Sequence, residues 1–203
     1  MLGLPESTER ATPLPKSDFF ERFRIAGKEK ARIDGEISRM AIAAFVSPAT
    51  IPAWPQDGRG IYVVELALKK REISAATLAL IAGKINQRIV FAMDFRGELQ
   101  LAVPWKRLVR GEWMTADRQR IALRRNVDET WLGIIADIAG LQPGSEAELD
   151  AQFALRDRRE KLAAEIERLD KAMRKERQFR RKHELYEQLR NLKKELETTG
   201  ATT

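Results

Sequence analysis

The stretch that decides the fold covers residues 61–95 and reads IYVVELALKKREISAATLALIAGKINQRIVFAMDF. Its first part, IYVVELALK (61–69), places successive side chains on opposite faces of an extended chain, which is the pattern of a strand. SAATLALIAGKI (74–85) is typical of a helix, with Ser74 as its N-cap. RIVFAMDF (88–95) is a second strand. The order strand, helix, strand permits one parallel pair joined by a right-handed crossover.

Further strands are expected on both sides of this unit. RMAIAAFV (39–46) is short, apolar and followed by Ser-Pro, which indicates a buried strand. ELQLAVPWKRL (98–108) follows Arg96-Gly97, a suitable hairpin turn. EWMTADRQRIAL (112–123) adds one or two strands. The sheet is therefore expected to contain about five strands.

Helices flank these strands. Residues 28–37 are predicted to form one helix. VDETWLGIIADIAG (127–140) is an amphipathic helix that ends at Gly140. The predicted fold class is α+β, with a mixed sheet and flanking helices over residues 17–140. A long C-terminal α-helical coiled-coil segment follows this domain.

The ends of the predicted domain are marked by composition. Residues 1–16 contain three prolines among polar residues and are expected to form an extended arm along a surface or free of it. Residues 141–145 (LQPGS) form a linker. Residues 199–203 are expected to be a disordered tail.

Residues 146–198 form the charged C-terminal segment, which contains neither glycine nor proline and is rich in helix formers. Its apolar residues fall into two runs with the alternating spacing of three and four that a coiled coil requires. The first run consists of Leu155, Leu162, Ile166, Leu169 and Met173, and the second of Leu185, Leu189, Leu192 and Leu196.

The two apolar runs are out of register. Two structures fit this break: an antiparallel helical hairpin, or one long helix that crosses the break as a stutter and pairs with a second chain. The absence of Gly, Pro, Asn and Asp at the break favours the long helix.

RKERQFRRK (174–182) lies between the runs and contains six basic residues and one acidic residue. Phe179 is apolar among these charges, and a single aromatic residue is a better anchor in a protein pocket than a platform for bases. Contact with a protein is therefore favoured over contact with DNA. The candidate nucleic-acid contacts are Arg174, Lys175, Arg177, Arg180, Arg181 and Lys182, helped by Lys106, Arg107 and Arg110 around two tryptophans.

The overall composition restricts the function. The 203 residues carry a formal net charge of +7, which favours acidic partners, and contain one histidine and no cysteine. Zinc and thiol chemistry are therefore improbable, and we expect no metal and no cofactor. The N-terminal residues do not form a signal peptide and no long apolar run is present, so a cytoplasmic protein without membrane contact is expected.

A metal-dependent nuclease is the enzymatic alternative. Asp57 precedes Glu65 in the strand, but Ala67 stands where such nucleases place a lysine. Lys69 lies on the same face as Glu65 about 13 Å away, at the rise of an extended chain. The cluster is broken, and the nuclease is the least favoured interpretation.

Several segments together resemble a bacterial family, the domain of unknown function 4391. They are the opening GLPESTERATPLPKSDFF, the strand IYVVELALK, the segment PWKR and the closing KERQFRRKHELYEQLRNLKKEL. The closing helix of that family carries a Lys-x-x-Gln-Phe-x-x-Lys pattern, matched here by Lys175, Gln178, Phe179 and Lys182. The chain departs from the family at Tyr186, where a polar residue often stands.

The resemblance implies a context rather than a reaction. Such proteins often lie near helicase-like ATPases and DNA methyltransferases in restriction-like or phage-defence gene clusters, and no catalytic residues carry over. We therefore expect a non-enzymatic accessory subunit. It would bind a helicase-like ATPase or a DNA methyltransferase, or a second copy of itself, through the C-terminal helix. A basic DNA-binding module is the alternative.

Overall fold

The computed structural model describes residues 2–55 and 59–200, and the chain divides after Ser145 into two compact units. The first unit is an α+β domain. Its helices are a short 3-10 turn, η1 (Glu6–Thr8), and α1 (Lys16–Arg22), α2 (Gly27–Glu36), α3 (Ala75–Ile85) and α4 (Val127–Ala139). The second unit consists of α5 (Glu146–Lys175) and α6 (Phe179–Gly200).

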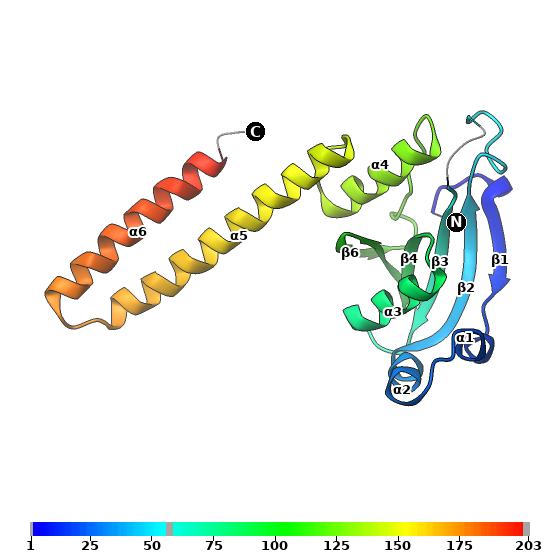
Figure 1. Cartoon of the computed structure of the whole chain (residues 1–203), viewed down its shortest axis with the longest axis horizontal. Helices are drawn as coiled ribbons and strands as arrows, with labels where there is room; N and C mark the ends of the chain where they lie inside the picture. Colours follow the sequence, from blue (N-terminus) through cyan, green and yellow to red (C-terminus); the bar gives the residue numbers. More distant parts are fainter. Residues whose placement is uncertain (1, 56–58, 201–203) are drawn as a thin grey trace. The chain divides into compact units, whose positions relative to one another are not determined.

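The domain is built on one mixed sheet in which the strands follow their order in the chain (Figure 1). Neighbouring strands are antiparallel except β3 and β4, which are parallel and connected through α3. The parallel pair that the element order of residues 61–95 permits is therefore present. The strands are β1 (Glu9–Pro13), β2 (Ile37–Val46), β3 (Ile61–Leu68), β4 (Arg88–Phe95), β5 (Glu98–Trp105) and β6 (Arg107–Thr115).

The described sheet has six strands, not about five, because part of the expected N-terminal arm is a strand. In β1, Thr12 pairs with Ile42 and Pro13 with Ala41 of β2. A proline is tolerated here because β1 lies at the edge of the sheet, where a missing N–H leaves no neighbour unpaired. The residues before β1 are also packed, since Leu2 and Leu4 are buried.

One face of the sheet carries the larger apolar core. Val64, Leu66 and Leu68 alternate along β3 and so lie on one face, where they are buried in a cluster with Phe91 of β4. Helices α1, α2 and α3 supply buried residues to the same cluster, among them Phe19, Phe20, Ile33, Leu78 and Ile81. Packing on this face holds the strands in place and so positions the turns that connect them.

The opposite face of the sheet is covered by α4. Val63 and Val90 are buried on this face, and the guanidinium of Arg88 lies over the ring of Trp131 of α4 at 5.8 Å from its centroid. Trp131 is a core residue. The end of α4 lies next to β6, because the side chain of Ile138 is adjacent to Gly111.

Local signals in the sequence correspond to observed turns and caps. The Ser74 hydroxyl accepts a hydrogen bond from the N–H of Thr77 at the start of α3. Arg96 and Gly97 both have positive φ in the turn between β4 and β5, as a tight hairpin turn requires. Gly140 ends α4 in the left-handed conformation.

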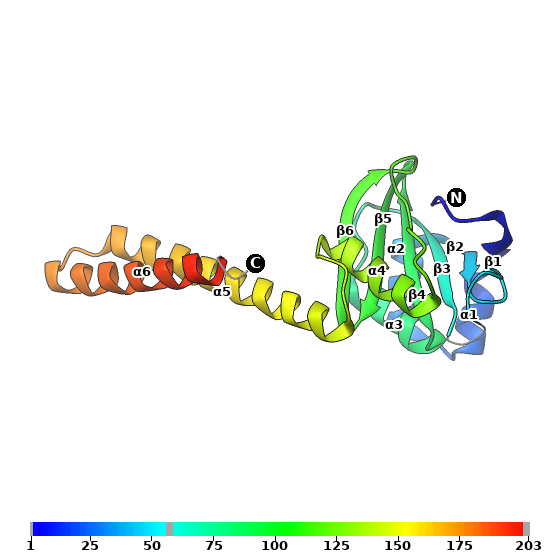
Figure 2. The ribbon, with the colours of Figure 1, turned by 90° about the horizontal axis from the view of Figure 1, so that it is seen from above.

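The second unit is a helical hairpin, so the favoured single long helix is wrong. The helix ends at Lys175 and restarts at Phe179, and α5 and α6 lie side by side in two views (Figures 1 and 2). The two helices are antiparallel, since Arg158 of α5 pairs with Glu195 of α6 at 2.7 Å.

A side chain explains why the chain reverses without glycine or proline. The carboxylate of Glu176 accepts hydrogen bonds from the backbone N–H groups of Arg177 and Gln178, at 2.8 and 2.9 Å. These groups precede a new helix and would otherwise lack partners. The hydrogen bond from Gln178 is the main reason that the pKa of Glu176 lies below its ordinary value. Of the expected disordered tail, Thr199 and Gly200 belong to α6, and residues 201–203 lie outside the described chain.

Candidate functional site

The turn of the hairpin presents an exposed aromatic residue surrounded by basic ones. We call residues 174–182 the hairpin tip. Phe179, the first residue of α6, has 88% of its surface exposed, the highest value among the exposed large apolar residues of the described chain. Burying this ring would be favourable, because its apolar surface would be removed from water.

Half of the basic residues of the hairpin tip form ion pairs within the hairpin. Arg174 pairs with Asp170 at 2.7 Å and Arg180 with Glu184 at 3.6 Å. Arg181 lies 3.6 Å from the carboxylate of Glu176. The remaining basic residues of the tip are exposed and have no ion pair with a described residue; they are Lys175, Arg177 and Lys182.

The predicted apolar seam lies along the hairpin but is incompletely covered. Leu169 of α5 and Leu189 of α6 are buried. The other seam residues are half-buried, and they are Leu155, Leu162, Ile166, Met173, Leu185, Leu192 and Leu196. A groove of about 570 Å³ runs along the helices, with Met173, Tyr186 and Leu189 among its lining residues. The two helices therefore leave part of the apolar seam open to water.

The three basic residues predicted around the tryptophans of the sheet do not share one set of surroundings. Lys106 and Arg107 are exposed at the turn between β5 and β6, and the ammonium of Lys106 lies 4.9 Å from the centroid of the Trp105 ring. Arg110 instead donates a hydrogen bond to the carbonyl of Ile73 at 2.8 Å. Partial burial lowers the pKa of Arg110 from its ordinary value.

The nuclease residues are engaged separately. Glu65 of β3 forms an ion pair with Arg39 of β2 at 2.8 Å, whereas the ammonium of Lys69 donates a hydrogen bond to the carbonyl of Asp34. Asp57 lies outside the described residues. Within the described chain no group of three or more acidic, histidine or cysteine side chains is placed to hold a metal ion.

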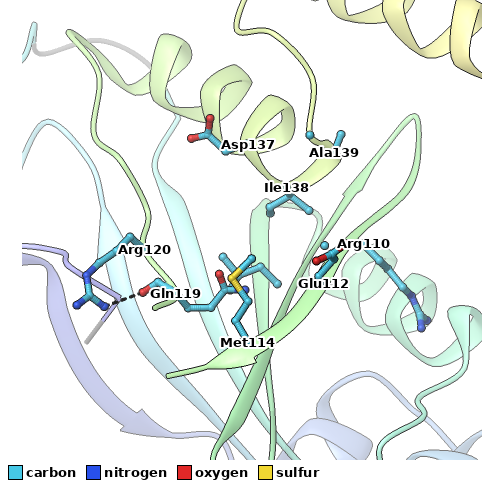
Figure 3. Close-up of a pocket in the computed structure, with 11 residues that line it drawn as sticks. Arg110, Glu112, Met114, Gln119, Arg120, Asp137, Ile138 and Ala139 are labelled. Atoms are coloured by element: carbon cyan, nitrogen blue, oxygen red, sulfur yellow. Dashed lines mark hydrogen bonds between the residues drawn. The ribbon is translucent and has the colours of Figure 1, made fainter. Parts of the chain in front are cut away.

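A cavity in the domain was not predicted from the sequence. It lies between β6 and the end of α4, has a volume of about 440 Å³, and is shown in Figure 3. We call it the bulge cavity, because Gly111 and Glu112 of β6 lie opposite the single residue Leu101 of β5. The side chain of Gln100 stabilises this bulge by donating to the carbonyl of Gly111 at 2.8 Å.

Gln119 gives the bulge cavity a polar group. The residue is only 7% exposed and lines the cavity, and Figure 3 shows it between Arg120 and Met114. No sequence pattern identified it, because a single glutamine in a connecting segment has no distinguishing spacing. Its interest comes from its burial, which only the structure shows.

Comparison with known families assigns nearly the whole chain to one family. Residues 2–196 match the family described as domain of unknown function (DUF4391), and the chain belongs to this family. No curated protein and no solved structure matches the chain. Over the described residues, none of the helices combines the length and apolar character needed to cross a bilayer.

Proposed function

We propose that this protein is a non-enzymatic assembly subunit that binds a larger protein through its C-terminal hairpin. The observation that carries the proposal is the exposed ring of Phe179 at the hairpin tip. Aromatic side chains that enter a pocket of the partner supply a large share of the binding energy in protein interfaces. A ring held at the start of a helix is positioned in advance, which reduces the entropy lost on binding.

The chemistry of the hairpin tip defines the partner surface. An apolar pocket for Phe179, bordered by carboxylates that meet Lys175, Arg177 and Lys182, would be complementary to it. The half-buried seam supports a second contact, in which a helix of the partner lies along α5 and α6. The family resemblance favours a helicase-like ATPase or a DNA methyltransferase of a restriction-like or phage-defence system as this partner.

Contact with DNA is the second candidate for the same surface. Its support is the basic character of the hairpin tip and the exposed Lys106 and Arg107. The internal ion pairs of Arg174, Arg180 and Arg181 weigh against it, since a phosphate would compete with a carboxylate that is already in place.

The first experiment is co-expression of the full chain with the helicase-like ATPase and with the DNA methyltransferase of the same cell, followed by purification and measurement of affinity. Phe179→Ala is expected to weaken the complex by about tenfold or more, the loss typical of an anchor residue. Gln188→Ala is the control, because Gln188 is an exposed residue of α6 that does not line the groove. Equal affinity of the wild type and Phe179→Ala for the partner would contradict the role of Phe179 as an anchor residue.

Light scattering and DNA titration separate the remaining alternatives. The purified chain is measured at about 0.1 M and 0.5 M salt, with and without duplex DNA, since phosphate contacts weaken steeply as salt is raised. A dimer at both salt concentrations would make a second copy the partner. A DNA complex that forms only at low salt, and whose salt dependence decreases by about one unit of slope for Lys182→Ala, would favour the DNA-binding module.

A further inference from the structure

A second pocket of the α+β domain lies on the sheet face opposite the larger core. Ala92 and Asp94 of β4 line it, and they alternate along the strand with Phe91 and Met93, which belong to the core. We call it the β4 pocket. Its volume is about 650 Å³, which is large enough for an aromatic side chain and is in the range of ligand-binding pockets.

Apolar residues from three parts of the chain line the β4 pocket. They are Ala92 of β4, Leu99 of β5 and Leu2, and all three are buried. The backbone holds Leu2 in place, because its carbonyl accepts a hydrogen bond from the N–H of Ile121 at 2.9 Å. Leu2 has a φ of +55°, a conformation that a leucine keeps only where its surroundings impose it. This wall of the pocket is therefore formed in advance, which reduces the entropy lost when a side chain enters.

The charged residues of the β4 pocket leave one carboxylate in excess. Three acidic residues and one arginine line it, and Glu65 among them is already paired with Arg39 at 2.8 Å. Asp94 and Asp117 form no ion pair with any residue in the described part of the chain. Arg120 attracts Asp117, but its guanidinium donates a hydrogen bond to a backbone carbonyl (Figure 3), and its charge offsets only one of the two carboxylates. A cation is therefore the complementary group for this pocket.

We propose that the β4 pocket receives the hairpin tip of a second copy of this chain. The ring of Phe179, which is 88% exposed, would enter between the apolar walls. The three cations of the tip that have no ion pair would then lie beside the carboxylates of Asp94 and Asp117. This inference rests on the proposed function in taking the hairpin tip as a protein-binding surface, and it adds a particular occupant and the pocket that the ring would enter.

The contact joins two different surfaces, the hairpin tip of one copy and the β4 pocket of the next. Each copy carries both surfaces, so the copies would associate into closed rings or open chains. A contact made by one ring and a few charges is small, and we expect it to be weak and reversible. The larger protein of the proposed function would compete with the second copy for the same ring.

Sedimentation equilibrium of the full chain, at concentrations up to about 1 mM, measures this weak association. Phe179→Ala removes the ring, and Asp117→Lys reverses a charge on an exposed side chain of the pocket. Each is expected to weaken association by about tenfold or more. Asp94→Asn is expected to weaken it less, because it removes the charge but keeps an acceptor for the N–H of Gly97. Circular dichroism checks that each variant is folded.

Glu72→Lys is the matched control for the change of charge. Glu72 is an exposed acidic residue of the same domain that does not line the β4 pocket, so this variant is expected to associate as the wild type does.

A mixture of two variants tests the geometry most sharply. Phe179→Ala keeps the β4 pocket and Asp117→Lys keeps the ring, so an equimolar mixture is expected to form one-to-one pairs that neither variant forms alone. Association through the apolar seam of the hairpin predicts a different result, because both variants would then associate as the wild type does.

Four results would overturn the proposal. They are no association of the wild type, unchanged association of Asp117→Lys, an equal loss in Glu72→Lys, and a mixture that forms no pairs. The proposed function is judged separately, by the affinity of the larger protein for Phe179→Ala. If that affinity falls while the chain does not associate with itself, the proposed function stands and only the assignment of the β4 pocket fails.

Discussion

Replacing Leu189 by alanine is expected to destabilise the hairpin while leaving the stability of the α+β domain unchanged. Leu189 is 4% exposed and is, with Leu169, one of the two fully buried residues of the seam. The chain divides into two compact units after Ser145, so the hairpin is expected to unfold in its own transition.

The size of the effect follows from the carbons that are removed. Leucine to alanine deletes three of them, worth about 2.4 kcal/mol at ~0.8 kcal/mol for each buried carbon. A cavity would add to this cost in a closed core. The seam is half-open along most of its length, so the neighbouring side chains move in and the added cost is small. The free energy of unfolding of the hairpin is expected to fall by about 2–3 kcal/mol.

The assay uses two signals that belong to different units. All four tryptophans (Trp54, Trp105, Trp113 and Trp131) precede the hairpin, so their fluorescence reports on the domain. Helices α5 and α6, with 30 and 22 residues, contain more than half of the α-helical residues described, so far-ultraviolet circular dichroism is dominated by the hairpin. Urea unfolding is followed by both signals.

The expected result is a lower midpoint for circular dichroism with an unchanged midpoint for fluorescence. Gln188→Ala, at the exposed neighbouring position of α6, is the control and is expected to change stability by less than about 0.5 kcal/mol. If Leu189→Ala lowers both midpoints together, the units do not unfold separately. If it lowers neither, Leu189 does not hold the hairpin together, and the reasoning is refuted.

Three further predictions concern the domain. Gly60→Ala is expected to lower its free energy of unfolding by about 1–3 kcal/mol, measured by urea unfolding, because the added Cβ would overlap the Phe45 ring. Asn126→Ala is expected to cost about 1 kcal/mol in the same assay, since its side chain caps α4 by accepting an N–H bond at 2.8 Å. Asp34→Asn is expected to lower the free energy of unfolding at pH 7 by less than about 1 kcal/mol, because it removes the ion pair with Lys16. The hydrogen bond from Lys16 holds the pKa of Asp34 below its ordinary value of 3.8. The stabilisation is therefore present above about pH 4 and is lost as the pH falls through the folded-state pKa.

Matched variants check these three predictions. Gly83→Ala, which has open space around its Cβ in α3, is expected to be neutral or stabilising where Gly60→Ala destabilises. Asn191→Ala lies in the middle of α6 and is expected not to reproduce the loss of the cap. For Asp34→Asn, a difference from the wild type that persists unchanged as the pH falls through the folded-state pKa of Asp34 would contradict the ion-pair explanation, since the side chain then loses its charge in the wild type.

The central part of the fold could be predicted because its signals are local and agree with one another. The alternation in IYVVELALK, the cap at Ser74 and the glycine of the hairpin turn each specify one element, and together they specify the parallel pair of β3 and β4. The edge strand β1 could not be predicted in the same way. All of its residues are exposed, so no alternation of apolar residues marks it, and Pro13 argues against a strand unless the edge position is known.

The reversal of the C-terminal segment was not predicted because a side chain supplies what glycine usually supplies. Glu176 caps the turn through two backbone N–H groups, and a glutamate among arginines and lysines reads as a surface charge. The out-of-register seam did indicate a break there. Gln119 shows the same limit for the site: the burial of a single glutamine in a connecting segment is a property of packing, which a sequence pattern does not carry.

The most direct test of the proposed function is photo-crosslinking from the hairpin tip in living cells. The photoreactive phenylalanine derivative p-benzoylphenylalanine replaces Phe179, whose exposed ring leaves room for the added group. In a control it replaces Gln188, an exposed residue of α6 that does not line the groove. The proposal predicts one discrete protein adduct from position 179 that the control does not give. Adducts with nucleic acid from position 179, or no adduct beyond those of the control, would contradict the assignment of the hairpin tip as a protein-binding surface.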